Sequence, residues 1–78
     1  MEKFIEENLE KDIKSFEKND DLYKRYLMYC QFYKLEPLTK RKFTNQLKNL
    51  NMGVKHHRMK NYVIEYGRWG VKLLPCKY

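Results

Sequence analysis

The sequence has little of what interrupts helices or cross-links small secreted domains. Its 78 residues include only three glycines, two prolines and two cysteines. So few glycines and prolines argue against a loop-rich or all-β fold. The cysteines, Cys30 and Cys76, lack the close spacing of a metal-binding or redox pair. We expect a reduced pair, with Cys30 as a buried thiol in a helix, while a single disulfide between the two stays open.

Long hydrophobic runs are also missing. No stretch approaches the roughly 18 apolar residues of a membrane-spanning helix, and the acidic N-terminus is unlike a secretory signal peptide. We therefore predict a soluble, cytoplasmic protein with no membrane partner. The chain is nonetheless 42% hydrophobic and 15% aromatic, which is too apolar for disorder and favours one small folded domain.

Acidic residues are absent from a long stretch of the chain, between Pro37 and Ile64. Residues 1–21 hold eight acids and four lysines, a net charge of −4. Residues 22–78 hold 13 bases and two acids, a net charge of +11. This asymmetry favours a polyanion partner, nucleic acid above all, for the second part. A high isoelectric point that serves solubility alone is the alternative.

Hydrophobic periodicity predicts helices over residues 2–16 and about 21–33. The first is acidic and carries one apolar stripe on an otherwise charged surface. That stripe consists of Ile5, Leu9, Ile13 and Phe16. The second carries a broad aromatic face around Leu22, Tyr26, Tyr29 and Tyr33. We interpret this face as core packing rather than as a platform for stacking bases.

A third helix is expected from Thr39, a good N-cap, to about residue 50. Its narrow inner stripe would be Phe43, Leu47 and Leu50. The opposite face is basic and amide-rich and carries no acid, unlike an ordinary solvated helix. This outward face comprises Arg41, Thr44, Asn45, Lys48 and Asn49.

Beyond Gly53, an expected left-handed helix terminator, the chain predicts a β-hairpin. Residues 54–58 and 67–73 read as its strands, with Trp69, Val71 and Leu73 alternating onto one face. The predicted fold class is therefore mainly α with a C-terminal β-hairpin, a winged helix-turn-helix. We expect an acidic helix over residues 1–19 (a linker or the first helix of the domain), a winged-helix domain over 20–74 and a tail over 75–78.

In a winged helix, the helix after the turn enters the DNA major groove and the hairpin touches the neighbouring backbone. Amide side chains suit adenine, and arginine or lysine suits guanine or phosphate. The candidate DNA-binding residues of the third helix are Thr39, Lys40, Arg41, Lys42, Thr44, Asn45, Lys48 and Asn49. Those of the hairpin, or wing, are Lys55, His57, Arg58 and Lys60, of which Arg58 is a candidate for a narrow minor groove. The expected partner is double-stranded DNA.

Metal and catalytic chemistry find little support in the sequence. Neighbouring side chains on a strand point to opposite faces, so His56 and His57 are not expected to share one ion. No Gly-rich phosphate loop, paired carboxylates or Ser/His/Asp arrangement occurs in the basic half. We expect no metal, no cofactor and no enzymatic activity in this chain by itself.

Four motifs resemble a known family. They are Leu22-Tyr23-x-x-Tyr26-x-x-Tyr29-Cys30, Glu36-Pro37-Leu38-Thr39, Phe43-x-x-x-Leu47 and Gly67-Arg68-Trp69-Gly70-Val71-x-Leu73. The chain resembles, over about residues 20–74, the C-terminal winged-helix domain of phage-, plasmid- and genomic-island-encoded primase-helicases. Those proteins are related to satellite-phage and poxvirus replication proteins. The Gly-Arg-aromatic-Gly strand is the most specific part of the match.

The resemblance implies a domain that follows a superfamily-3 helicase and binds DNA, in some members at the replication origin. Because the chain has no Walker motif, it would be an excised domain or a stand-alone relative. The acidic first helix would then connect to the ATPase domain or dock another subunit. Two alternatives stay open: a winged-helix adaptor that binds protein, and a small dimeric repressor from a mobile element.

Overall fold

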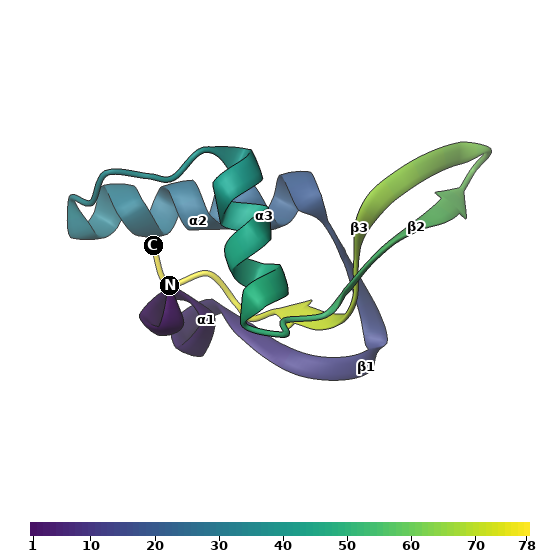
Figure 1. Ribbon diagram of the computed structural model, residues 1–78, viewed down its shortest axis with the longest axis horizontal. Helices are drawn as coiled ribbons and strands as arrows, with labels where there is room; N and C mark the ends of the chain where they lie inside the picture. Colours follow the sequence, from purple (N-terminus) through teal and green to yellow (C-terminus); the bar gives the residue numbers. More distant parts are fainter.

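Three helices and a three-stranded antiparallel sheet make up the fold (Figure 1). The computed structural model describes residues 1–78. The elements are α1 (Glu2–Asn8), β1 (Leu9–Lys18), α2 (Asn19–Tyr33), α3 (Lys40–Asn49), β2 (Val54–Lys60) and β3 (Val63–Leu73). Helices hold 41% of the residues and strands 36%, so the fold is mixed α/β rather than mainly α. None of the helices combines the length and the apolar character needed to span a membrane.

The predicted helix over residues 2–16 was wrong beyond Asn8. Residues 9–18 form β1, which pairs antiparallel with β3 and places Phe16 opposite Trp69. Leu9 and Phe16 are buried, but Ile13 is 87% exposed, so the expected apolar stripe does not exist as one face. The Glu–Lys pairs that favour a helix here contribute only about 0.2–0.5 kcal/mol each. Pairing with the open edge of β3 outweighs them.

The sheet has the strand order β1-β3-β2, so β3 is the central strand and β1 and β2 are the two edge strands. The expected alternation of Trp69, Val71 and Leu73 onto one face was wrong for Trp69. Val71 belongs to the core cluster and Leu73 packs against it, whereas the Trp69 ring packs on Phe16 outside that cluster, at a centroid distance of 5.1 Å. Gly70, with a φ of +88°, lies between Trp69 and Val71. The β1–β3 register shifts at the same place, where four residues of β1 bulge out. A bulge of this kind re-aims the side chains on either side of it.

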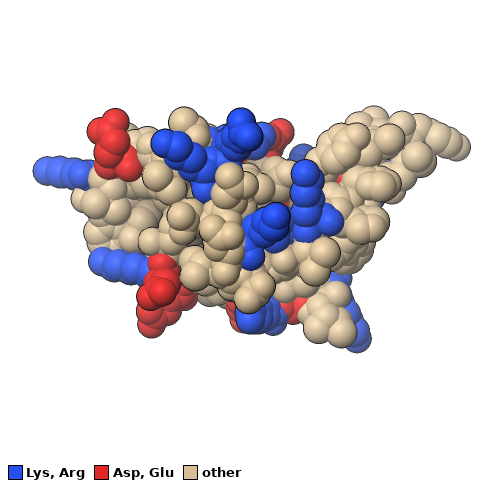
Figure 2. Space-filling view, viewed as in Figure 1, with Lys and Arg blue, Asp and Glu red and all other residues tan.

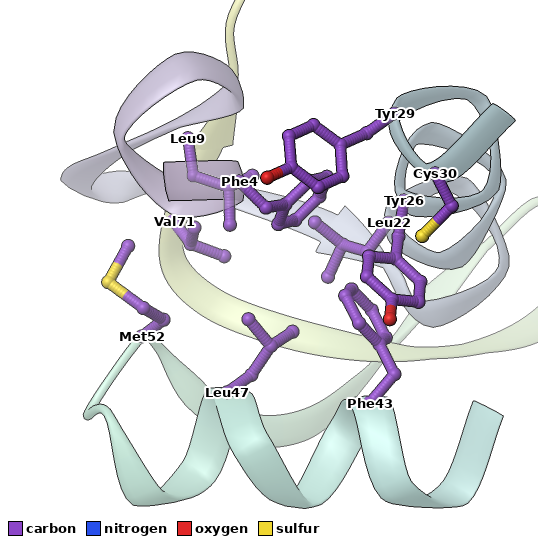
Figure 3. Packing of buried hydrophobic residues seen from close by; sticks show 10 residues of the cluster. All are labelled: Phe4, Leu9, Leu22, Tyr26, Tyr29, Cys30, Phe43, Leu47, Met52 and Val71. Atoms are coloured by element: carbon purple, nitrogen blue, oxygen red, sulfur yellow. The ribbon is translucent and has the colours of Figure 1, made fainter. Parts of the chain in front are cut away.

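The core lies between α1, α2, α3 and the inner end of the sheet (Figure 3). Phe4 fills its centre and meets the rings of Tyr26, Tyr29 and Phe43 at centroid distances between 5.4 and 5.7 Å. The full cluster is Phe4, Leu9, Leu22, Tyr26, Tyr29, Cys30, Phe43, Leu47, Met52 and Val71. The interpretation of the α2 aromatics as core residues is therefore confirmed. Cys30 is a buried free thiol, and Cys76 is free and exposed.

Both ends of the chain pack onto the same body. Asn8 is fully buried and its amide donates to the Phe4 carbonyl at 3.0 Å and to the Tyr78 hydroxyl at 2.9 Å. The Tyr78 ring in turn lies 5.2 Å from Phe32 on α2. Arg25 donates to the Leu74 carbonyl at 2.6 Å. The N-terminal helix and the last residue thus belong to one packed unit with α2.

Candidate nucleic-acid interface

Helix α3 presents a basic, amide-rich face to solvent. The Thr39 hydroxyl accepts a hydrogen bond from the Lys42 amide at 3.4 Å, which confirms the predicted N-cap. Phe43 and Leu47 anchor the inner side of the helix in the core. The predicted outward residues Arg41, Asn45, Lys48 and Asn49 are exposed, and Thr44 is half-buried. Figure 2 shows lysine and arginine side chains gathered over and beside this helix.

Two adjoining concavities, of about 540 and 400 Å³, lie between α3 and the start of β2. They share Thr44, Asn45 and Lys55 and form one depression, which we call the α3–β2 groove. Its other lining residues are Asn19, Lys40, Arg41, Lys48, Asn51, Gly53, Val54 and Arg68. With Lys55, five of the residues that line the groove are lysine or arginine and none is acidic, so the groove is positively charged.

Ion pairs decide which cations of the groove are free. Lys40 pairs with Asp20 at the start of α2, and its hydrogen bond holds the pKa of Asp20 below the ordinary value. Arg41, Lys48 and Lys55 have no carboxylate within ion-pair distance. These three side chains are therefore available to an anionic ligand.

The wing residue Arg58 lies apart from the groove. Its Nε donates to Glu65 Oε1 at 2.8 Å, and its guanidinium carbon lies 4.5 Å from the centre of the Phe16 ring. The hydrogen bond from Arg58 holds the pKa of Glu65 below its ordinary value. Lys55 lines both concavities of the groove, whereas Arg58 lines neither. The structure thus brings Lys55, but not Arg58, to α3.

The remaining sequence-predicted residues are exposed but do not line the groove. Lys42 and Asn49 lie on α3, and His57 and Lys60 lie on β2. None of the four belongs to either concavity. Only a ligand that extends beyond the groove would contact them.

Sequence reasoning missed the role of Arg68. Only 3% of this residue is exposed, and it donates to the Met52 carbonyl at 2.6 Å and to the Gly53 carbonyl at 2.8 Å. Burial lowers the pKa of its guanidinium. Arg68 therefore ties β3 to the turn that follows α3 and fixes the helix relative to the hairpin. The motif Gly67-Arg68-Trp69-Gly70 could have marked Arg68 as important for the fold. Simple alternation along the strand, with Trp69 facing the core, instead predicted an exposed Arg68 side chain.

The expectation that His56 and His57 point to opposite faces was wrong. Their rings lie 5.0 Å apart at an interplanar angle of 15°. The His56 Nδ1 atom also lies 2.7 Å from the His57 carbonyl oxygen, so the two residues are in direct contact. No group of three His, Cys, Asp or Glu side chains in the structure could hold a metal ion.

Comparison with known families shows which family the chain belongs to. The sequence profile of the family described as Poxvirus D5 protein-like matches residues 1–68. The chain belongs to this family. The Poxvirus D5 protein-like family is associated with primase-helicase replication proteins, which confirms the resemblance inferred from the motifs. The match includes α1 and β1, which the motif-based resemblance left outside. A search of curated proteins finds no match to the chain.

Proposed function

We propose that the chain is a winged-helix domain that binds double-stranded DNA for a replication protein of the Poxvirus D5 protein-like family. Its order of elements, α-β-α-α-β-β with the strand order β1-β3-β2, supports this proposal because it is the order of a winged helix. In this proposal α3 enters the major groove and β2–β3 is the wing. The role is binding rather than catalysis.

The observation that carries the proposal is the acid-free α3–β2 groove. Free cations from two elements, Arg41 and Lys48 on α3 and Lys55 on β2, line one surface. A convergence of unpaired cations without any carboxylate fits the phosphate backbone, whose contacts dominate affinity for DNA. Solubility alone requires neither the convergence nor the absence of acids.

In this proposal two amide side chains of α3 read the bases. Asn45 lines the groove beside the cations and Asn49 is exposed outside it, and an amide can bond an adenine edge at two points. Arg41 and Lys48 serve guanine or phosphate. The first free amides of α3, next to Thr39, suit a backbone phosphate. Lys40 would first have to release Asp20.

The test is a fluorescence-anisotropy titration of a labelled duplex at several salt concentrations. We expect binding that weakens steeply with salt, and loss of binding in the triple variant R41A/N45A/K48A with an unchanged circular dichroism spectrum. The matched control is K14A/K77A, which removes two exposed positive charges that do not line the groove. Equal losses in both variants would reduce the effect to net charge, and absence of wild-type binding at low salt would end the DNA proposal.

A protein-binding adaptor is the second candidate, and one observation favours it. The outer side of α2 and the following turn expose four large apolar residues, Leu27, Met28, Phe32 and Leu35. An exposed apolar patch is typical of a surface that binds another protein. Binding to a replication subunit that is lost in F32A, without any binding to DNA, would favour this role over DNA recognition.

A further inference from the structure

The tip of the β2–β3 hairpin projects from the body of the molecule (Figure 1). It is a two-residue turn, Asn61-Tyr62, closed by the pair Lys60 and Val63. Both turn residues have positive φ, 51° for Asn61 and 64° for Tyr62. Hairpin turns of this kind favour Asn followed by Gly, because glycine adopts a positive φ without steric cost.

Tyrosine is an unfavourable residue at this position. A bulky side chain at positive φ is strained, and such strain persists where other constraints or a function retain it. Packing does not retain Tyr62, because 98% of the residue is exposed. The fold would keep its turn, with less strain, if residue 62 were glycine. The side chain itself is therefore the feature to be explained.

The surroundings of Tyr62 are apolar and basic. Met59 and Val63 are exposed beside it, and the exposed Lys60 is the partner of Val63 in the pair that closes the turn. Towards the body β2 carries Arg58, two histidines and Lys55. The one acid of the hairpin, Glu65, is within ion-pair distance of both Arg58 and Lys18. The exposed Tyr62 ring fits an aromatic face of a ligand, and the cationic residues of the hairpin nearer the body fit negative charge next to that face.

We propose that Tyr62 stacks on an exposed nucleobase at the end of a duplex or at a junction between duplex and single strand. This inference rests on the proposed function, because the α3–β2 groove holds the adjoining duplex. Aromatic side chains stack on any base with little sequence preference. Inside an intact duplex both faces of each base are covered by its neighbours, so Tyr62 finds a partner only where a base is terminal or unpaired.

The test compares two DNA probes by fluorescence anisotropy. One is a duplex with a single-stranded tail, and the other is the same duplex with both ends closed by covalent loops that leave no terminal base pair. We expect the wild type to bind the tailed probe about tenfold more tightly. The variant Y62G should lose that preference while its affinity for the closed duplex stays the same. Its melting temperature should equal or exceed that of the wild type, because glycine relieves the strained turn.

Two further variants separate the possible roles of the side chain. Y62F keeps the ring and should retain the preference, whereas Y62N tolerates the positive φ, lacks the ring and should lose it. An unchanged preference in Y62G would overturn the proposal. An equal loss of affinity for both probes would also overturn it, in favour of an apolar wedge into intact DNA. Failure of the wild type to bind the closed duplex at all would instead contradict the proposed function.

Discussion

Tyr33 on α2 contacts two side chains of the N-terminal helix, Glu7 and Lys3. Its hydroxyl donates to Glu7 Oε1 at 2.8 Å, and the Lys3 ammonium lies 3.9 Å from the centre of its ring. Hydrogen bonding to the Glu7 carboxylate is the main reason that the pKa of Tyr33 is raised to about 12. Proximity to this negative charge disfavours the tyrosinate anion.

This pKa predicts a loss of stability in alkali. Because the folded pKa lies above the ordinary value of about 10, the contribution of Tyr33 is complete below pH 10 and is lost as the pH rises towards 12. Urea unfolding between pH 9 and pH 12 should show a smaller alkaline loss in Y33F and E7Q than in the wild type. Ultraviolet titration of E7Q should show tyrosines ionising at lower pH than in the wild type, Tyr33 above all, because it loses the hydrogen bond to the carboxylate. The same alkaline loss in all three proteins would contradict the assignment.

Arg68 yields a second prediction at the scale of the residue. Replacing it with alanine leaves the Met52 and Gly53 carbonyls without their donors, which should lower the free energy of unfolding by roughly 2–4 kcal/mol. R68K should lose less, because lysine keeps the charge but lacks the planar fork. Urea denaturation measures both, with K72A, an exposed position on the same strand, as the control. A variant R68A as stable as K72A would contradict the bracing role.

At the scale of the element, the two sides of the hairpin have different duties. Lys55 faces α3 without a carboxylate partner, whereas Arg58 is engaged by Glu65 and Phe16 on the other side. Charge alone made both residues equal candidates in the sequence. The cross-strand register separates them, because it decides which residue of β2 stands on which face.

The hairpin therefore predicts unequal effects on DNA binding. In K55A the slope of log K against log salt should fall by roughly one, since one phosphate contact is lost. In R58A the slope should change less, because its charge is already paired. Anisotropy titrations over a salt series measure both slopes. A larger change in R58A than in K55A would show that the other side of β2 faces the DNA.

At the scale of the whole molecule, the first 18 residues are part of the core and of the sheet. Phe4 lies at the centre of the aromatic cluster, and β1 pairs with β3 along its length on both sides of the bulge. Gly67 shows how close this pairing is, because a Cβ there would overlap the Glu17 carbonyl oxygen. A domain that begins at residue 20 would lack all of these contacts.

Removal of residues 1–18 should accordingly prevent folding. The truncated chain is expected to lose the cooperative thermal transition of the full chain, as measured by circular dichroism. The control I13A should change the free energy of unfolding by no more than about 0.5 kcal/mol, because Ile13 is 87% exposed on the bulge of β1. If I13A lowered the free energy of unfolding by several kcal/mol, the result would support the amphipathic helix that periodicity predicted. Cooperative unfolding of the truncated chain would show that the core closes without β1.

The sequence by itself determined α2, α3, the Thr39 cap and the basic outward face of α3. These features depend on contacts three or four residues apart, so local periodicity and capping specify them. Only the tertiary structure decided that residues 9–18 form a strand, that Trp69 turns outward, and that Arg58 is paired away from the groove. Each of these outcomes depends on pairing with β3, a partner distant in sequence, and that pairing overrides the local preference of the segment.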